Sequence, residues 1–242
     1  MLFLVFAAML TPNDIGNVAP LWNELILGDS PEIVAEKLGK LPEVSKIKVK
    51  RSIKAGKEPD VDINLVGAGY EILGDAYQIN PVFNAGKLKF VKLSTGQTCR
   101  NTAFTRYASL TDALRAKYPN VAHEGFEQKD KGAFIQAELD HLNGRRGSLY
   151  TALTNGVTTV HVTVEILTIA RPSINYNGNA ITRSLNDLQW SIYRTQLQAC
   201  GGTGDQRAMI SINYHSAENF NAMIETVKAT MTDEKEMAKD RL

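Results

Sequence analysis

The chain has 242 residues, of which 43% are hydrophobic and 22% are charged, so it can bury a substantial core as one large domain or two small ones. Its 27 basic and 26 acidic side chains leave a formal net charge of +1. No global electrostatic field therefore steers the protein toward nucleic acid or an anionic membrane, and a partner attracted by charge must meet a local patch.

The N-terminus is apolar. Residues 1–10 form an unbroken hydrophobic run, which has the length of a signal-peptide core and is too short to span a bilayer. We therefore expect residues 1–19 to be a signal peptide, with cleavage near Ala19, and the protein to be periplasmic or secreted. A mature N-terminal strand or helix is the alternative, because no Lys or Arg precedes the run and residues 17–19 are a poor cleavage site.

A short amphipathic helix is expected after Ser30. Ser30 is a suitable N-cap, Pro31 fits the first helical position, and Glu32 favours the positive end of the helix dipole. The helix should end near residues 39–42. Alternating apolar and polar side chains then predict strands around residues 47–49 and at 60–66, 70–79, 82–83 and 87–94, with a hairpin turn at 84–86.

The strand at residues 87–94 changes phase. Leu88 and Phe90 lie on one face, whereas Val91 and Leu93 lie on the other. This break predicts either a β-bulge or a strand buried on both faces.

The second half of the chain repeats the order of a helix followed by strands. Spacing predicts a helix from Tyr107 to Tyr118, stopped by Pro119. Residues 124–146 are polar and fit no single element. The further predicted elements are a strand at 159–166, a helix or a strand at 184–199, a strand at 209–214 and a closing helix at 217–231. In the strand at 159–166, alternation predicts that Val160, Val162 and Val164 point inward and that His161 points outward.

These elements predict an α+β fold, in which an antiparallel sheet carries helices packed on one face. Because a helix followed by strands occurs twice, the chain is divided after the leader into two possibly pseudo-repeated helix-plus-sheet units, residues 20–104 and 105–242. No residue-level repeat proves a duplication.

The segment of residues 25–39 resembles the opening of small bacterial envelope modules of the outer-membrane-assembly lipoprotein type. Those modules begin with a Gly-x-Ser/Thr turn, which Gly28 and Ser30 match. Their helix carries a valine and ends in Leu-Gly, which Val34 and Leu38-Gly39 match. The tandem form resembles the β-lactamase-inhibitor-protein fold. The resemblance implies a non-catalytic periplasmic binding or assembly role and carries over no functional residue.

The two cysteines, Cys99 and Cys200, each lie at the end of a predicted element. In an exported protein they are expected to form a disulfide, which would stabilise the fold by roughly 4 to 5 kcal/mol in the chain-entropy model. Two buried thiols are the alternative. Neither cysteine has a Cys-x-x-Cys partner or a nearby histidine in the sequence, so neither is predicted to be catalytic.

A basic segment occupies residues 46–57. On an alternating strand Lys46, Lys48 and Lys50 share one face and, with Lys54, form a possible anion-binding patch for phosphates, anionic lipid or an acidic partner. Lysines also prevent edge-to-edge pairing of sheets, and edge protection or plain solvation is the favoured interpretation.

A possible polar site combines Glu138, Asp140, His141 and His161, whose side chains could serve acid–base chemistry or metal binding. No second histidine stands at metal-ligand spacing, so a solvated loop around residues 138–146 and a lone surface histidine at 161 are the favoured interpretations. No catalytic residue, metal or cofactor is predicted.

The leading functional expectation is a non-enzymatic binding or protein-interaction module, with another envelope protein as a candidate partner. A hydrolase that uses Glu138, Asp140 and His141, or binding of anionic lipid or nucleic acid through residues 46–57, is the alternative. No transmembrane segment and no clear nucleic-acid site are predicted, and the oligomeric state is left open.

Overall fold

The computed structural model describes residues 19–52, 60–67, 69–168, 200 and 206–239. Its helices are α1 (Pro31–Leu38), α2 (Arg100–Arg115), α3 (Lys131–Leu142) and α5 (Ala217–Lys239). Its strands are β1 (Val44–Ser52), β2 (Asp60–Gly67), β3 (Tyr70–Ile72), β4 (Asp75–Asn84), β5 (Lys87–Ser94), β6 (Thr98–Cys99), β7 (Asn120–Val121), β8 (Ser148–Thr154), β9 (Thr158–Thr168) and β10 (Gln206–Ser216).

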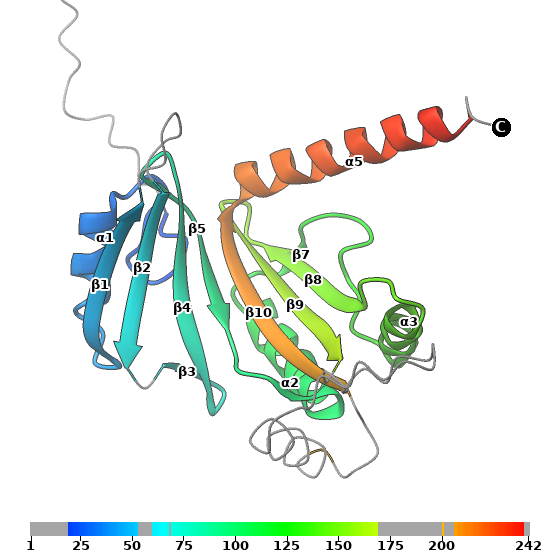
Figure 1. Ribbon diagram of the computed structural model, residues 1–242, viewed down its shortest axis with the longest axis horizontal. Coiled ribbons are helices and arrows are strands. Elements are labelled where there is room, and N and C mark those ends of the chain that lie inside the picture. The colour runs from blue at the N-terminus through cyan, green and yellow to red at the C-terminus, as the bar shows by residue number, and fades with distance from the viewer. Residues whose placement is uncertain (1–18, 53–59, 68, 169–199, 201–205, 240–242) are drawn as a thin grey trace, which may run out of the picture.

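The strands form two antiparallel sheets, so the predicted α+β class is confirmed (Figure 1). The larger sheet has the order β3-β4-β5-β10-β9-β8-β7, and β6 also pairs with β10. The strands β1 and β2 pair only with each other in the described part of the chain. No helix in the described ranges is long and apolar enough to cross a membrane.

The pairing of β5 with β10 joins the two halves of the chain. Val91 lies opposite Tyr214, and Ser94 lies opposite Ser211. The boundary expected between residues 104 and 105 falls inside α2. The two expected helix-plus-sheet units therefore share one sheet.

The predicted helices exist, but their ends differ from the expectation. The Ser30 hydroxyl caps α1 by accepting a hydrogen bond from the Ile33 amide at 3.4 Å. α2 starts at Arg100, well before the expected Tyr107. α3 lies in the segment that fitted no element, and the Asp130 carboxylate caps it. The segment 184–199 lies outside the described residues.

One strand prediction was wrong in part, and the phase break predicted in the strand at residues 87–94 is confirmed. The single strand expected at residues 70–79 is a hairpin, because Leu73 and Gly74 both adopt positive φ angles, 52° and 82°, and turn the chain between β3 and β4. In β5 the phase break is a bulge, since the register with β4 shifts between Val82 and Phe83. Leu88 and Val91 are then both buried.

One face of the large sheet carries the main core. Val160, Val162 and Val164 of β9 are each 0% exposed, as their alternation predicted. They pack in one cluster with Ala103, Tyr107 and Leu110 of α2. The Tyr107 hydroxyl lies 2.6 Å from Thr151 Oγ1 of β8, so α2 is joined to the sheet by a buried hydrogen bond.

The opposite face receives α5, so the helices do not all pack on one face as expected. Phe220 and Ile224 of α5 cluster with Ala152 of β8, which lies opposite His161 of β9 and on its side of the sheet. Figure 1 shows the C-terminal part of α5 extending away from the sheet. The helix therefore covers only one end of this face.

The predicted disulfide is present. Cys99 Sγ and Cys200 Sγ are 2.05 Å apart. Cys99 belongs to β6 and lies opposite Arg207 of β10. The bridge therefore links the start of α2 to the segment that precedes β10.

Candidate functional site

A hollow opens on the face of the large sheet that α2 does not cover, and we call it the sheet cup. Its volume is about 430 Å³. The residues that line it are Lys92, Phe126, Arg146, Ser148, Tyr150, His161, Thr163, Glu165, Ser211 and Asn213.

The register of the strands assembles the cup. Asn213 of β10 lies opposite both Lys92 of β5 and His161 of β9. One pleat along, Ser211 lies opposite Thr163, and Thr163 lies opposite Tyr150 of β8. Because side chains alternate between the faces of a strand, these polar residues share the face opposite the valine core.

Aromatic rings close one side of the cup. The Phe126 ring lies 4.9 Å from the Tyr150 ring and 5.7 Å from the His161 ring, measured between centroids. Phe220 of α5 is fully buried, and its ring lies 5.8 Å from that of His161. The main chain of Phe126 is held in place because its carbonyl accepts a hydrogen bond from the Ala152 amide at 2.9 Å.

His161 and His215 lie on this face, and His161 is not the exposed surface histidine that the sequence suggested. Burial lowers the pKa of His161 to about 4, and burial also lowers the pKa of His215 to about 4. Both imidazoles are therefore neutral at pH 7. His161 Nε2 lies 3.3 Å from Thr163 Oγ1, and His215 stacks on Phe90 with ring centroids 4.8 Å apart.

The charges in the cup are unevenly paired. Arg146 and Glu165 form an ion pair with an N–O distance of 3.5 Å, and the Arg146 side chain is 77% exposed. Lys92 is half-buried and has no ion-pair partner among the residues that the structure describes. The Lys92 ammonium is thus a positive charge without compensation in a partly enclosed polar hollow.

The cup is also rich in hydrogen-bond donors. The Tyr150 hydroxyl accepts a hydrogen bond from Gln128 Nε2 at 3.0 Å, which leaves its own proton free to be donated. Ser211 contributes a second hydroxyl. Donors and an unpaired ammonium suit an anionic group.

The structure does not gather the polar site suggested by the sequence. Glu138 pairs with Arg100 of α2 at 2.8 Å. Asp140 accepts a hydrogen bond from Gln136 and lines an adjoining hollow of about 340 Å³ beside α3, which shares Arg146, Ser148 and Tyr150 with the sheet cup. His161 belongs to the sheet cup. In the described part of the chain, no group of three or more His, Cys, Asp or Glu side chains is placed to hold a metal ion.

The described part of the basic segment, residues 46–52, belongs to β1. Lys46, Lys48 and Lys50 are exposed along β1. This strand pairs with β2 alone in the described part of the chain, and Lys50 lies opposite Asp62. Lys54 lies outside the described residues. Lysines along such an edge oppose pairing with another chain.

Sequence reasoning missed most of the cup. It named His161 but not Lys92, Tyr150 or Asn213, which come from three other strands. The alternation of β9 did place His161 on the face opposite the valines. The strand order that brings the other residues beside it could not be read from any single strand.

Comparison with protein-family models, curated proteins and solved structures found no match. The function is therefore inferred from the geometry and charge of the sheet cup and from the disulfide between Cys99 and Cys200.

Proposed function

We propose that the protein is a non-enzymatic binding module of the cell envelope and that the sheet cup binds a small organic anion. The ligand class is a carboxylate attached to a ring or another apolar group. The observation that carries the proposal is the unpaired ammonium of Lys92 in a partly enclosed hollow with aromatic rings on one side.

Each part of such a ligand has a counterpart in the cup. A carboxylate beside Lys92 would gain a charge-assisted hydrogen bond, and the Ser211 and Tyr150 hydroxyls would supply further donors. The rings of Phe126 and Tyr150 offer an apolar surface for the rest of the ligand. Few precisely placed polar groups within a largely preformed hollow are typical of small-molecule sites.

The hydrolase alternative has less support. His161 lies near the Thr163 hydroxyl, as a general base would. However, a pKa of about 4 makes its imidazole a weak base near neutral pH, where general-base catalysis is most effective with a pKa close to the working pH. Glu138 and Asp140 are engaged elsewhere, by Arg100 and Gln136.

The envelope location is supported by the disulfide, because such bridges persist mainly in oxidising compartments. The mass of the intact protein from its native host, measured with and without reduction, tests this part. We expect removal of residues 1–19 and a mass that rises by two hydrogens on reduction. A full-length, fully reduced product would contradict the location.

Titration of the ¹⁵N-labelled full chain with benzoate, phenylacetate and indole-3-acetate, followed by NMR, tests the binding site. At least one of these carboxylates should shift amide signals of the residues around Lys92, Asn213 and Tyr150. Its neutral amide, which keeps the ring and the shape, should bind at least about tenfold more weakly because it lacks the charge that Lys92 recognises.

The matched variants are Lys92→Gln and Lys87→Gln. Lys87 is exposed at the start of the same strand and does not line the cup. We expect Lys92→Gln to weaken carboxylate binding about tenfold and Lys87→Gln to leave it unchanged. Shifts outside the cup for all three carboxylates, or equal affinity of Lys92→Gln and the parent chain, would overturn the assignment.

A further inference from the structure

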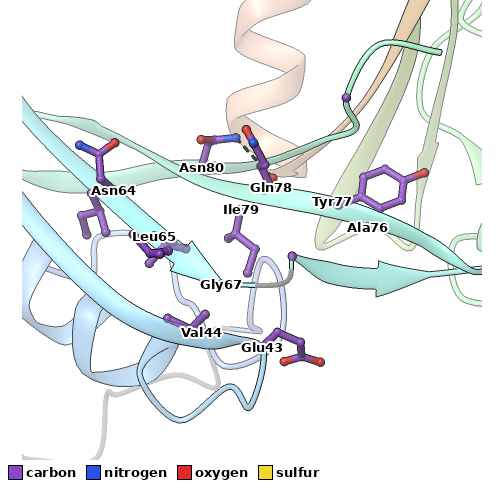
Figure 2. Close-up of a pocket in the computed structure, with 14 residues that line it drawn as sticks. Glu43, Val44, Asn64, Leu65, Gly67, Ala76, Tyr77, Gln78, Ile79 and Asn80 are labelled. Atoms are coloured by element: carbon purple, nitrogen blue, oxygen red, sulfur yellow. Dashed lines mark hydrogen bonds between the residues drawn. The ribbon is translucent and has the colours of Figure 1, made fainter.

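A second hollow lies between β2 and β4, and we call it the β2–β4 groove (Figure 2). Its volume is about 430 Å³. None of its lining residues belongs to the sheet cup, so the groove is a separate feature of the molecule. Its walls come from both sheets.

The groove exists because the two sheets do not merge. β2 pairs with β1 on one side and β4 pairs with β5, but no strand pairing joins β2 to β4 in the part of the chain that the structure describes. Side chains such as Leu65 and Ile79 occupy the boundary instead (Figure 2).

A glycine sets the lower rim of the groove. A Cβ atom at Gly67 would lie 1.8 Å from the carbonyl oxygen of Glu43, so only glycine allows the end of β2 to approach residue 43 this closely. The approach places Glu43 beside the groove, as Figure 2 shows.

Glu43 is the charged residue of the groove, and its charge is not compensated. Its Oε2 atom is buried and has no hydrogen-bond partner among the residues that the structure describes. No Lys, Arg or His lines the groove in the described residues. A buried carboxylate oxygen without a partner is unfavourable. A cation bound at Glu43 would therefore gain a favourable ion pair with this carboxylate.

The other polar groups of the groove favour a donor-rich ligand. Asn80 Nδ2 is directed to Ser94 Oγ at 3.3 Å, and Asn64 Nδ2 to Asp62 Oδ2 at 3.4 Å. Each amide therefore retains its carbonyl oxygen as an acceptor. Ile63, Leu65 and Ile79 supply apolar contacts from the alternate positions of the same two strands.

We propose that the β2–β4 groove binds an alkyl ammonium or alkyl guanidinium group, with the cation at Glu43 and the alkyl chain along Leu65 and Ile79. The guanidinium is the stronger candidate, because its planar set of donors matches the geometry of a carboxylate. This site goes beyond the proposed anion site in charge, position and ligand class.

NMR titration of the full ¹⁵N-labelled chain with butylguanidinium, butylammonium and neutral 1-butanol tests the proposal. We expect both cations to shift amide signals of β2 and β4, with 1-butanol at least about tenfold weaker. The sheet cup shares no lining residue with this groove, so failure here is distinguishable from failure of the anion site.

The decisive variant is Glu43→Gln, which removes the charge and keeps the shape. It should lower the affinity for butylguanidinium at least about tenfold, whereas Glu24→Gln, at an exposed position outside the groove, should not. Gly96→Phe is a second variant, because a Cβ at Gly96 meets no heavy atom within 4 Å and the ring can obstruct the groove.

Three results would overturn the proposal. Glu43→Gln, shown to be folded by circular dichroism, could bind butylguanidinium as well as the parent chain does. Gly96→Phe could leave the affinity unchanged. 1-Butanol could bind as tightly as the cations, which would make the groove an apolar cavity only.

Discussion

The two faces of β9 serve different purposes. On one face Val160, Val162 and Val164 are fully buried under α2. On the other, His161 and Thr163 line an open hollow that α5 covers only at one end. In this strand the even-numbered positions 160–164 contribute stability by burial. The odd-numbered positions between them face the hollow.

The difference between the faces is one of solvent access. Leu149 of β8 is 0% exposed against the main core, whereas its neighbour Ser148 lines the cup. Burial of apolar area dominates the stability of the first face. The second face retains polar side chains that line an open hollow.

The largest expected effect separates the faces directly. Leu149→Ala should lower the free energy of unfolding by about 2 to 5 kcal/mol, because it leaves a cavity in the core. Ser148→Ala, one residue earlier and on the cup face, should change it by less than about 0.5 kcal/mol. Urea denaturation of both variants measures the two values, and similar losses would contradict the division into two faces.

The cup face should also make stability depend on pH. Burial lowers the pKa values of His161 and His215 to about 4, below the value of about 6.5 in an unfolded chain. Between pH 6.5 and 4 these histidines are therefore protonated in the unfolded chain and neutral in the folded protein. The free energy of unfolding consequently falls as the pH drops toward 4.

Each histidine contributes a slope of up to about 1.4 kcal/mol per pH unit within that interval. Urea denaturation between pH 7 and 4 measures the slope. His161→Gln should reduce this slope by up to about 1.4 kcal/mol per pH unit, the contribution of one histidine, even if the variant is less stable at pH 7. An unchanged slope would show that His161 is protonated equally easily in the folded and unfolded protein.

A smaller effect is expected for the polar link on the core face. Tyr107 is fully buried, and its hydroxyl lies 2.6 Å from Thr151 Oγ1. Tyr107→Phe should cost about 1 to 3 kcal/mol, because the Thr151 hydroxyl loses its partner in a dry core. Thr151→Val in the Tyr107→Phe background should recover part of the loss. Chemical denaturation of the single and double variants measures this coupling.

The smallest effect on stability is expected at the rim of the cup. Arg146 is 77% exposed and pairs with Glu165 at 3.5 Å, and such surface ion pairs contribute little. Arg146→Gln should change the unfolding free energy by less than about 0.5 kcal/mol. It should nevertheless weaken carboxylate binding, because it removes a positive charge from the rim of the cup. A variant that loses stability but not affinity would contradict the proposed role of this face.

Local patterns were sufficient for several features. The cap at Ser30, the valine alternation of β9 and the pairing of Cys99 with Cys200 agree with the expectations drawn from them. These features depend on neighbouring residues or, for the cysteines, on there being a single possible pair. The hairpin at Leu73 was missed, because a non-glycine residue with a positive φ angle leaves a weak signal in a sequence.

The sequence by itself determined the α+β class and the faces of the individual strands, because capping and side-chain alternation are local properties. It also determined the disulfide partners, because two cysteines allow a single pair. The tertiary structure alone decided which strands are neighbours. That order places Asn213 between Lys92 and His161, and it leaves Glu43 at the boundary between two sheets that do not pair within the described residues. Both candidate sites combine charged and polar side chains that are distant in the chain, and no local pattern specifies which of them meet.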